Sequence, residues 1–231
     1  MGNLKKIVVL TGAGISAESG LKTFRDANGL WEGHNVMEVA SVIGWQQNKE
    51  LVLDFYDKRR IQLLEVVPNE AHKALVQLED HYSVDIITQN VDDLHERAGS
   101  SNVLHLHGEL LKVRSTKNSK LIYDWQKDVN IGDLCDENSQ LRPHIVWFGE
   151  EVPMFEKAME ITQKADILII IGTSMQVYPA ANLIDYIKSN IPIYFIDPKP
   201  AIRKNQFSKL VVISEKATVG LPKLISELID L

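Results

Sequence analysis

The chain has 231 residues and 45% of them are hydrophobic, which is typical of a folded domain and argues against disorder. The formal net charge of −6 argues against nucleic acid as the main partner, since phosphate binding needs clustered Lys and Arg. No apolar run approaches the roughly 18 residues of a membrane span, and the N-terminus lacks a signal-peptide pattern. The single cysteine, Cys135, excludes an internal disulfide, and a reducing cytoplasm is the simplest setting for it. We expect one domain, monomeric by default, with no nucleic-acid or membrane partner.

Short apolar runs alternate with helix-like segments along the chain. The runs are rich in Ile and Val and show no polar alternation, which indicates strands buried on both faces of a parallel sheet. They lie at residues 7–10, 84–87, 167–171, 191–196 and 210–213. Residues 69–78, 178–187 and 221–229 carry apolar side chains at helical spacing. This order predicts an α/β fold. Residues 28–68 indicate a helical insert and residues 110–140 are polar and irregular, so we expect both in a small second lobe.

The first predicted strand leads directly into a glycine turn of the form G-x-G-x-x-A at residues 12–17. Such glycines let backbone N–H groups approach a pyrophosphate, and the N-terminus of a following helix favours negative charge. A tight turn without a ligand fits the same pattern. An ordinary dinucleotide fold would also place Asp or Glu at the end of a second strand about 20 residues later, and that is missing. A loop-like segment stands there instead, in which Arg25 can reach a phosphate and Phe24 can cover a nicotinamide ring.

Further motifs follow in a fixed order and together resemble the sirtuin family over about residues 5–225. They lie at residues 12–20 with 23–26, 88–92, 105–108, 141–150, 172–174 and 177–180. The resemblance implies a Rossmann-like doubly wound parallel sheet with a small inserted lobe, and a cleft where NAD meets an acyl-lysine protein or peptide. It also implies NAD-dependent deacylation that yields nicotinamide, free lysine and O-acyl-ADP-ribose.

The resemblance assigns the cofactor contacts residue by residue. Ala13, Gly14 and Arg25 would line the phosphates, Phe24 would shield the ribose and nicotinamide side, and Gln89 would contact a ribose. The nicotinamide amide would be held by Ile15, Asn90 and Asp92, and the phosphates and adenosine ribose would also meet Gly172, Thr173 and Ser174. Gly12, Ala17, Asp197 and Ala217 complete the predicted cofactor-binding set. Asn90 and Asp92 equally suit the cap of a helix starting near Val91.

His107 and Asn90 are the predicted catalytic residues. His107 matches the family's catalytic histidine, which takes a proton from a ribose hydroxyl, and an imidazole titrates near neutrality as that role requires. Most lone histidines are structural, and His105, two residues earlier, fits that role. We expect His107→Ala to abolish turnover while NAD still binds.

Tyr56 and Arg59 are three residues apart, so they share a face if residues 28–68 are helical. Arg can donate two parallel hydrogen bonds to a carboxylate and Tyr a third. The pair resembles that of sirtuins that remove succinyl, malonyl and glutaryl groups, and Ala40 matches the small residue of that subgroup. A solvated basic turn at residues 58–60 fits the composition equally well. We predict a preference for these acidic acyl groups with weaker deacetylation.

Residues 144–150 and 176–178 match the two family segments that bind the substrate backbone by strand addition. The predicted substrate-binding residues there are Val146, Trp147, Phe148, Gly149, Glu150, Val177 and Tyr178. Core packing is the alternative for Trp147 and Phe148.

The small lobe departs from the family pattern. Most sirtuins hold a structural zinc with two pairs of cysteines, whereas this chain has only Cys135, so we predict no metal. The lobe would instead be held by packing and hydrogen bonds, for example of Leu121, Tyr123 and Trp125.

Three other functions share part of this pattern. An NAD hydrolase would release nicotinamide without any peptide, and a non-enzymatic NAD sensor would bind NAD without turnover. A dehydrogenase would need the missing ribose-binding acid.

Overall fold

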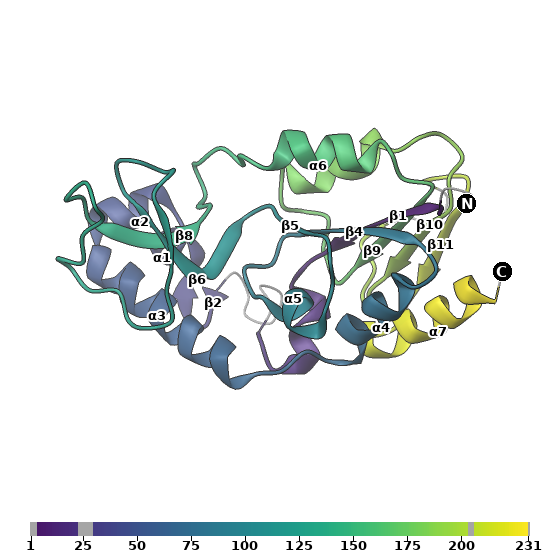
Figure 1. Cartoon of the computed structure of the whole chain (residues 1–231), viewed down its shortest axis with the longest axis horizontal. Helices are drawn as coiled ribbons and strands as arrows, with labels where there is room; N and C mark the ends of the chain where they lie inside the picture. The colour runs from purple at the N-terminus through teal and green to yellow at the C-terminus, as the bar shows by residue number, and fades with distance from the viewer. Residues whose placement is uncertain (1–3, 23–29, 203–205, 231) are drawn as a thin grey trace.

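The computed structural model describes residues 4–22, 30–202 and 206–230. A six-stranded parallel sheet runs in the order β11-β10-β9-β1-β4-β5 (Figure 1). Its strands are β1 (Lys6–Thr11), β4 (Ser83–Thr88), β5 (Val103–His105), β9 (Ile167–Ile171), β10 (Ile193–Ile196) and β11 (Leu210–Ile213). The predicted α/β fold with a doubly wound parallel sheet is confirmed. Strand β5 was not predicted, because it has three half-buried residues and no apolar run.

Helices cover both faces of this sheet. Helices α4 (Glu70–Leu78) and α7 (Ala217–Ile229) lie on one face, and α6 (Phe155–Thr162) with the 3₁₀-helix η4 (Ala180–Tyr186) lies on the other (Figure 1). Side chains of β1 alternate between these layers: Ile7 and Val9 pack in the first, Val8 and Leu10 in the second. Residues 178–187 were predicted as an ordinary helix but contain the 3₁₀-helix η4, because apolar spacing over two turns is similar in both helix types.

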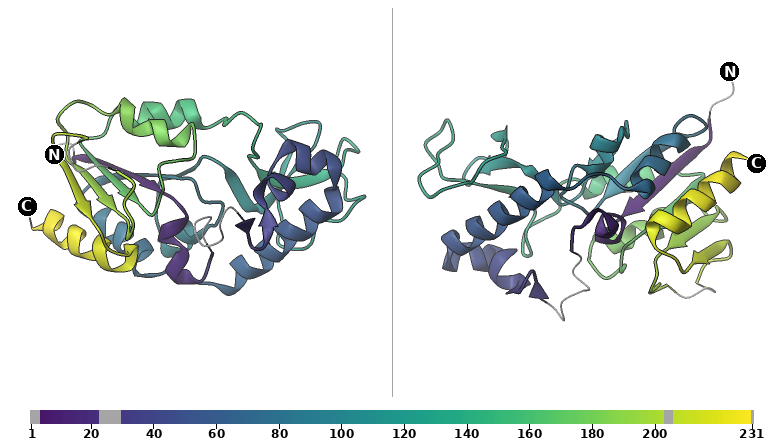
Figure 2. Two further views of the ribbon diagram at one scale, coloured as in Figure 1. Left: turned by 180° about the vertical axis from the view of Figure 1, so that it is seen from behind. Right: turned by 90° about the horizontal axis from the view of Figure 1, so that it is seen from below.

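A second, smaller lobe stands beside the sheet (Figures 1 and 2). It contains the hairpin β2 (Leu30–Trp31) and β3 (His34–Asn35), and the helices α1 (Val36–Val39), α2 (Val42–Gln47) and α3 (Lys49–Glu65). Its antiparallel sheet, in the order β7-β6-β8, is formed by β6 (Gly108–Ser115), β7 (Ile122–Asp124) and β8 (Leu141–Ile145). Residues 110–140 therefore contain two regular strands, although their sequence is irregular. Strand β6 alternates between buried and partly buried side chains, so polar residues interrupt its apolar ones.

Packing and hydrogen bonds hold the small lobe around Cys135. This side chain is buried in the core shared by α3, β6 and β8, and its thiol donates to Ser115 Oγ at 3.3 Å. Leu121, Tyr123 and Trp125 pack against the same core, as expected. Within the described ranges, no group of three or more His, Cys, Asp or Glu side chains could hold a metal ion. The absence of zinc stays a prediction. Among all the helices of residues 4–22, 30–202 and 206–230, none combines the length and apolarity needed to cross a bilayer.

The strand order changes direction between β1 and β9. From β1 the chain adds β4 and β5 on one side, and later β9, β10 and β11 on the other. Ligands of such sheets bind at the carboxyl ends of the strands at this switch point. The segment after β1 forms two 3₁₀-helices, η1 (Ala13–Ile15) and η2 (Ala17–Ser19), and not the expected helix N-terminus. Gly20, at a φ of 105°, caps η2 and ends this segment.

Candidate active site

Two glycine turns meet at the switch point, one after β1 and one after β9. The N–H of Gly14 donates to the carbonyl of Gly172 at 2.8 Å, and the N–H of Gly12 donates to Ile171 at 3.0 Å. A Cβ on Gly14 would lie 2.5 Å from Gly172 Cα, and Gly172 itself has a φ of 61°. The close contact between the two turns therefore requires glycine at positions 14 and 172, independently of any ligand that binds there.

A buried polar cluster lies behind the first turn. Ser16 Oγ donates to Asp92 Oδ2 at 2.9 Å and accepts from Asn90 Nδ2 at 3.1 Å. Burial raises the pKa of Asp92 to about 6, although the hydrogen bond from Ser16 favours its charged form. Asp92 Oδ1 also accepts from Leu94 N at 3.3 Å, the first residue of α5 (Leu94–Ala98). Asp92 thus takes part both in the cluster and in the helix start, and α5 begins later than the expected Val91.

Two residues that support this cluster were not predicted. Ser16 lies inside the glycine motif at residues 12–17. Its hydroxyl group is the sequence feature that could have indicated a polar contact. Asn69, the N-cap of α4, donates from Nδ2 to the carbonyl of Ile15 at 2.8 Å and to Ser19 Oγ at 3.0 Å. The start of α4 therefore fixes the glycine-turn segment from outside.

The ring of His107 has a defined orientation. Its Nδ1 lies 3.0 Å from the carbonyl oxygen of Gln89, and because a carbonyl only accepts, Nδ1 carries the hydrogen. Nε2 of the neutral ring is then the proton acceptor. Burial lowers the pKa of His107, with the hydrogen bond to Gln89 opposing this effect. Gly108, at a φ of 84°, packs so closely on β8 that a Cβ would lie 1.9 Å from the His144 carbonyl, so the backbone beside His107 is fixed.

Gln89 connects this histidine to the second glycine turn. Its side chain donates from Nε2 to Thr173 Oγ1 at 3.1 Å, and its own N–H donates to Thr11 at 2.9 Å. The carbonyl that orients His107 is thus held between β1 and the end of β9.

His105 differs from His107, because both of its ring nitrogens are engaged. Nε2 lies 2.7 Å from Glu96 Oε1, and Nδ1 lies 3.2 Å from the carbonyl of Asn90. Burial alone would lower the pKa of His105, but the hydrogen bond and charge of Glu96 raise it overall. His105 therefore has a structural role.

The predicted peptide-binding edge is paired with the small lobe. Phe148 N donates to the carbonyl of Ala40 at 2.9 Å, and Val42 N donates to the carbonyl of Phe148 at 3.2 Å. Phe148 and Tyr178 are 45% and 69% exposed, which leaves them open to a ligand. Trp147, in contrast, is buried against Trp45 and Tyr56, so core packing accounts for it.

Glu150 was predicted to bind substrate, but its carboxylate is engaged within the protein. It pairs with Arg142 at 2.7 Å and with Arg114 at 3.0 Å, and it accepts from Trp147 N at 2.9 Å. The guanidinium of Arg142 in turn stacks on the Trp147 ring, 3.2 Å from its centroid. This network orders the segment after β8, whose backbone is the predicted binding element.

Tyr56 and Arg59 lie on α3 as predicted, with different partners. The hydroxyl of Tyr56 is buried and accepts from Trp147 Nε1 at 3.0 Å. Burial raises the pKa of Tyr56, so the hydroxyl keeps its proton at neutral pH. Arg59 Nη1 lies 3.3 Å from Glu32 Oε1, and its guanidinium lies over the ring of Phe55.

The remaining predicted residues divide into four groups. Ala13, Ser174, Val146 and Val177 are partly exposed, while Ala17 and Gly149 are exposed. Asp197 is buried just after β10, and Ala217 opens α7 beside Thr218, whose N–H donates to Glu18 of η2 at 3.4 Å. Phe24 and Arg25 lie outside the described residues.

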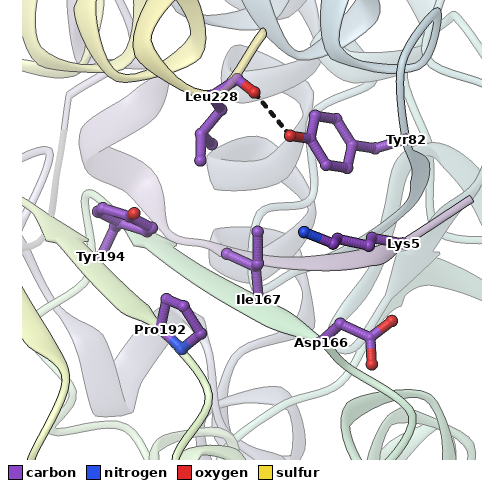
Figure 3. A pocket seen from close by; sticks show the side chains of 7 residues that line it. All are labelled: Lys5, Tyr82, Asp166, Ile167, Pro192, Tyr194 and Leu228. Carbon is purple, nitrogen blue, oxygen red and sulfur yellow. Dashed lines mark hydrogen bonds between the residues drawn. The ribbon is translucent and has the colours of Figure 1, made fainter. Parts of the chain in front are cut away.

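A separate hollow of about 480 Å³ lies at the other end of the strands, beside the amino ends of β1, β9 and β10 (Figure 3). Lys5 and Asp166 border it just before β1 and β9, and Tyr82 closes it by donating to the carbonyl of Leu228 at 2.6 Å. It contains none of the predicted site residues and faces away from the carboxyl ends of the strands, so we do not assign the active site to it.

Comparisons with known proteins match the chain to one family. The model of the Sir2 family matches residues 12–179. An NAD-dependent protein deacylase of Helicobacter pylori is 59% identical over 99% of both chains, and one of Bacteroides thetaiotaomicron is 49% identical over 96% of this chain and 97% of its own. A solved Sir2 homologue in complex with NAD superposes with a TM-score of 0.87 at 38% identity, over 98% of this chain and 90% of its own. A Sir2 structure bound to an acetylated peptide superposes with a TM-score of 0.80 at 28% identity, over 97% and 93%.

The chain therefore belongs to the Sir2 family. It is an NAD-dependent protein deacylase, and NAD is its cofactor.

Proposed function

We propose that this deacylase prefers lysine side chains whose acyl group ends in a carboxylate, namely succinyl, malonyl or glutaryl, and that it removes acetyl groups more slowly. The observation that carries the proposal is the state of Arg59. Its side chain is only 17% exposed, and within the described residues its Nε and Nη1 atoms have no hydrogen-bond partner. A buried donor without an acceptor costs about 1–3 kcal/mol, so this guanidinium favours a ligand that supplies acceptors.

The surroundings of Arg59 suit a carboxylate at the end of an acyl chain. Tyr56, one turn away on α3, contacts Trp147, and Ala40 pairs with Phe148 on the predicted peptide edge. Tyr56, Ala40 and Trp147 belong to one buried core. We infer that the small side chain of Ala40 leaves room for a longer acyl chain, whose terminal carboxylate would meet the positive charge of Arg59.

The residues at the switch point fit NAD. Asn90 and Asp92 are buried polar groups with few other partners than Ser16, and they can hold a carboxamide, which has both donors and an acceptor. Because the pKa of Asp92 is about 6, it is mainly ionised at neutral pH and can accept from an amide NH₂ group. Gly12, Gly14 and Gly172 present backbone without side chains to the phosphates. When bound, NAD supplies the ribose that receives the acyl group, and nicotinamide is released.

His107 is the proposed general base. Its Nδ1–H is held by Gln89, so Nε2 is available to take a proton from a ribose hydroxyl. Its lowered pKa keeps the ring neutral at pH 7, which is the form that accepts a proton. Asn90 lies on the same chain segment as Gln89 and completes the proposed catalytic pair.

The acyl-lysine segment of a protein or peptide would bind by strand addition between Gly149 and Tyr178. Main-chain hydrogen bonds give affinity with little demand on sequence, which suits an enzyme with many targets. The exposed side chains of Phe148 and Tyr178 would cover the lysine side chain.

The test compares matched succinyl-lysine and acetyl-lysine peptides in Arg59→Met. Losing hydrogen bonds to a charged group costs about 1.5–3 kcal/mol, so kcat/KM for the succinyl peptide should fall roughly 10- to 100-fold. The acetyl reaction should fall far less. Lys58→Met is the matched control, because it removes the same charge from the exposed neighbouring position on α3. Equal losses on both peptides in Arg59→Met, or faster acetyl removal by the wild type, would contradict an acidic acyl preference.

A further inference from the structure

The hairpin β2–β3 places a carboxylate of the protein itself against Arg59. Glu32 and Gly33 form its two-residue turn, with φ values of 51° and 83°. Two positive φ values are typical of the turn that matches the twist of a hairpin. The tip of such a hairpin is normally solvated, yet the Glu32 side chain is only 13% exposed.

Aromatic contacts hold this hairpin against α3. The ring of Trp31 lies edge-on to Phe55, with centroids 4.9 Å apart, and to Tyr56 at 6.3 Å. His34, on the other strand, contacts the same Phe55 ring at 5.7 Å. The position of Glu32 is therefore set by packing on the helix face that carries the proposed acyl-carboxylate subsite.

Glu32 lies between two cations. Its Oε1 is 3.3 Å from Arg59 Nη1, and its Oε2 is 3.2 Å from Lys22 Nζ. One negative and two positive charges give these three side chains together a net charge of +1. The ion pair offsets the charge of Arg59 without supplying a hydrogen-bond acceptor of good geometry, since Nε and Nη1 have none within the described residues.

We propose that Glu32 is an internal carboxylate that competes with the carboxylate of the acyl group for Arg59, and so sets how strongly acidic acyl-lysines bind. The proposal rests on the function proposed above, because it requires Arg59 to receive the acyl carboxylate. A substrate carboxylate that reaches Arg59 meets a like charge on Glu32, which weakens its binding. Lys22 is 65% exposed and already in contact, so it retains Glu32 as a partner when Arg59 turns to the substrate.

The test is Glu32→Gln, which keeps the shape of the side chain and removes its charge. KM for a succinyl-lysine peptide should fall roughly three- to tenfold with kcat little changed, because binding and not the chemical step is altered. KM for the matched acetyl-lysine peptide should stay within about twofold, since acetyl has no charge to repel. Calorimetric Kd values for both peptides provide a readout that is independent of turnover.

Two further variants complete the design. Asp54→Asn removes one negative charge from an exposed position of α3, the helix that carries Arg59. It should leave KM unchanged for both the succinyl-lysine and the acetyl-lysine peptide, and so controls for the change in net charge. Glu32→Asp keeps the charge, is tolerated at a positive φ, and withdraws the carboxylate from Arg59 by one methylene. It should give a succinyl KM between those of the wild type and Glu32→Gln. It also keeps the test decisive if Glu32→Gln does not fold.

The outcomes separate this inference from the proposed function. If Arg59→Met loses desuccinylation selectively but both Glu32 variants leave the succinyl KM unchanged, the competition by Glu32 is wrong and the function stands. A higher succinyl KM in Glu32→Gln would also overturn the competition, because Glu32 would then position Arg59 for the substrate. If Arg59→Met does not discriminate between the peptides, the proposed function fails, and this inference fails with it.

Discussion

Asp92→Asn tests the electrostatics of the buried cluster behind the first glycine turn. Burial raises the pKa of Asp92 from 3.8 to about 6, so at pH 8 the folded protein holds an ionised carboxylate that the unfolded chain would solvate better. Asparagine has the same shape and no charge. Its carbonyl can still accept from Leu94 N, and its amide can donate to Ser16.

The direction of the pH effect follows from the raised pKa. The stabilising contribution of Asp92 is fully present below pH 3.8 and is lost as the pH rises through about 6. Over that whole range the change is about 3 kcal/mol, at about 1.4 kcal/mol for each pKa unit. Between pH 8 and pH 5 it is about 1.4 kcal/mol, because at pH 5 the folded carboxyl is already mainly protonated and the unfolded one is not.

The assay is urea unfolding of the wild type and Asp92→Asn at pH 8 and pH 5. The wild type should gain about 1.4 kcal/mol of unfolding free energy relative to the variant when the pH falls from 8 to 5. Asp54→Asn, an exposed carboxylate, should follow the wild type at both pH values. A stability difference that is the same at both pH values, or that changes in the opposite direction, would refute the electrostatic argument.

Two other variants test the remaining parts of the site. His107→Ala should reduce turnover at least a hundredfold, because it removes the proposed proton acceptor, while calorimetry should still detect NAD binding; retained turnover would exclude His107 as the base. Gly14→Ala should lower the unfolding free energy by about 1–3 kcal/mol and weaken NAD binding, because its Cβ would lie 2.5 Å from Gly172 Cα and the two turns would have to separate. Unchanged melting temperature and NAD affinity would mean that the turns are not packed as described.

Local patterns in the sequence were enough to predict most of the large lobe. The strands at residues 7–10, 84–87 and 167–171 were recognised because both sheet faces are buried, which leaves unbroken apolar runs. The motifs around His107 and Asn90 are contiguous in the sequence, so they could be recognised without knowledge of the fold. Strand β5 and the 3₁₀-helix η4 were missed or misassigned, because three-residue strands and short helices leave too little periodicity.

The sequence by itself determined the fold class and the family, and it predicted the segments of the candidate site, because these depend on periodicity and on contiguous motifs. Only the tertiary structure decided which side chains meet. Asn69 supports Ile15 across 54 residues, and the carboxylate of Glu150 pairs with Arg142 and Arg114. The hairpin that brings Glu32 to Arg59 is likewise set by packing on α3. Such ion pairs depend on distances in space that no local pattern encodes, since the packing of distant elements sets them.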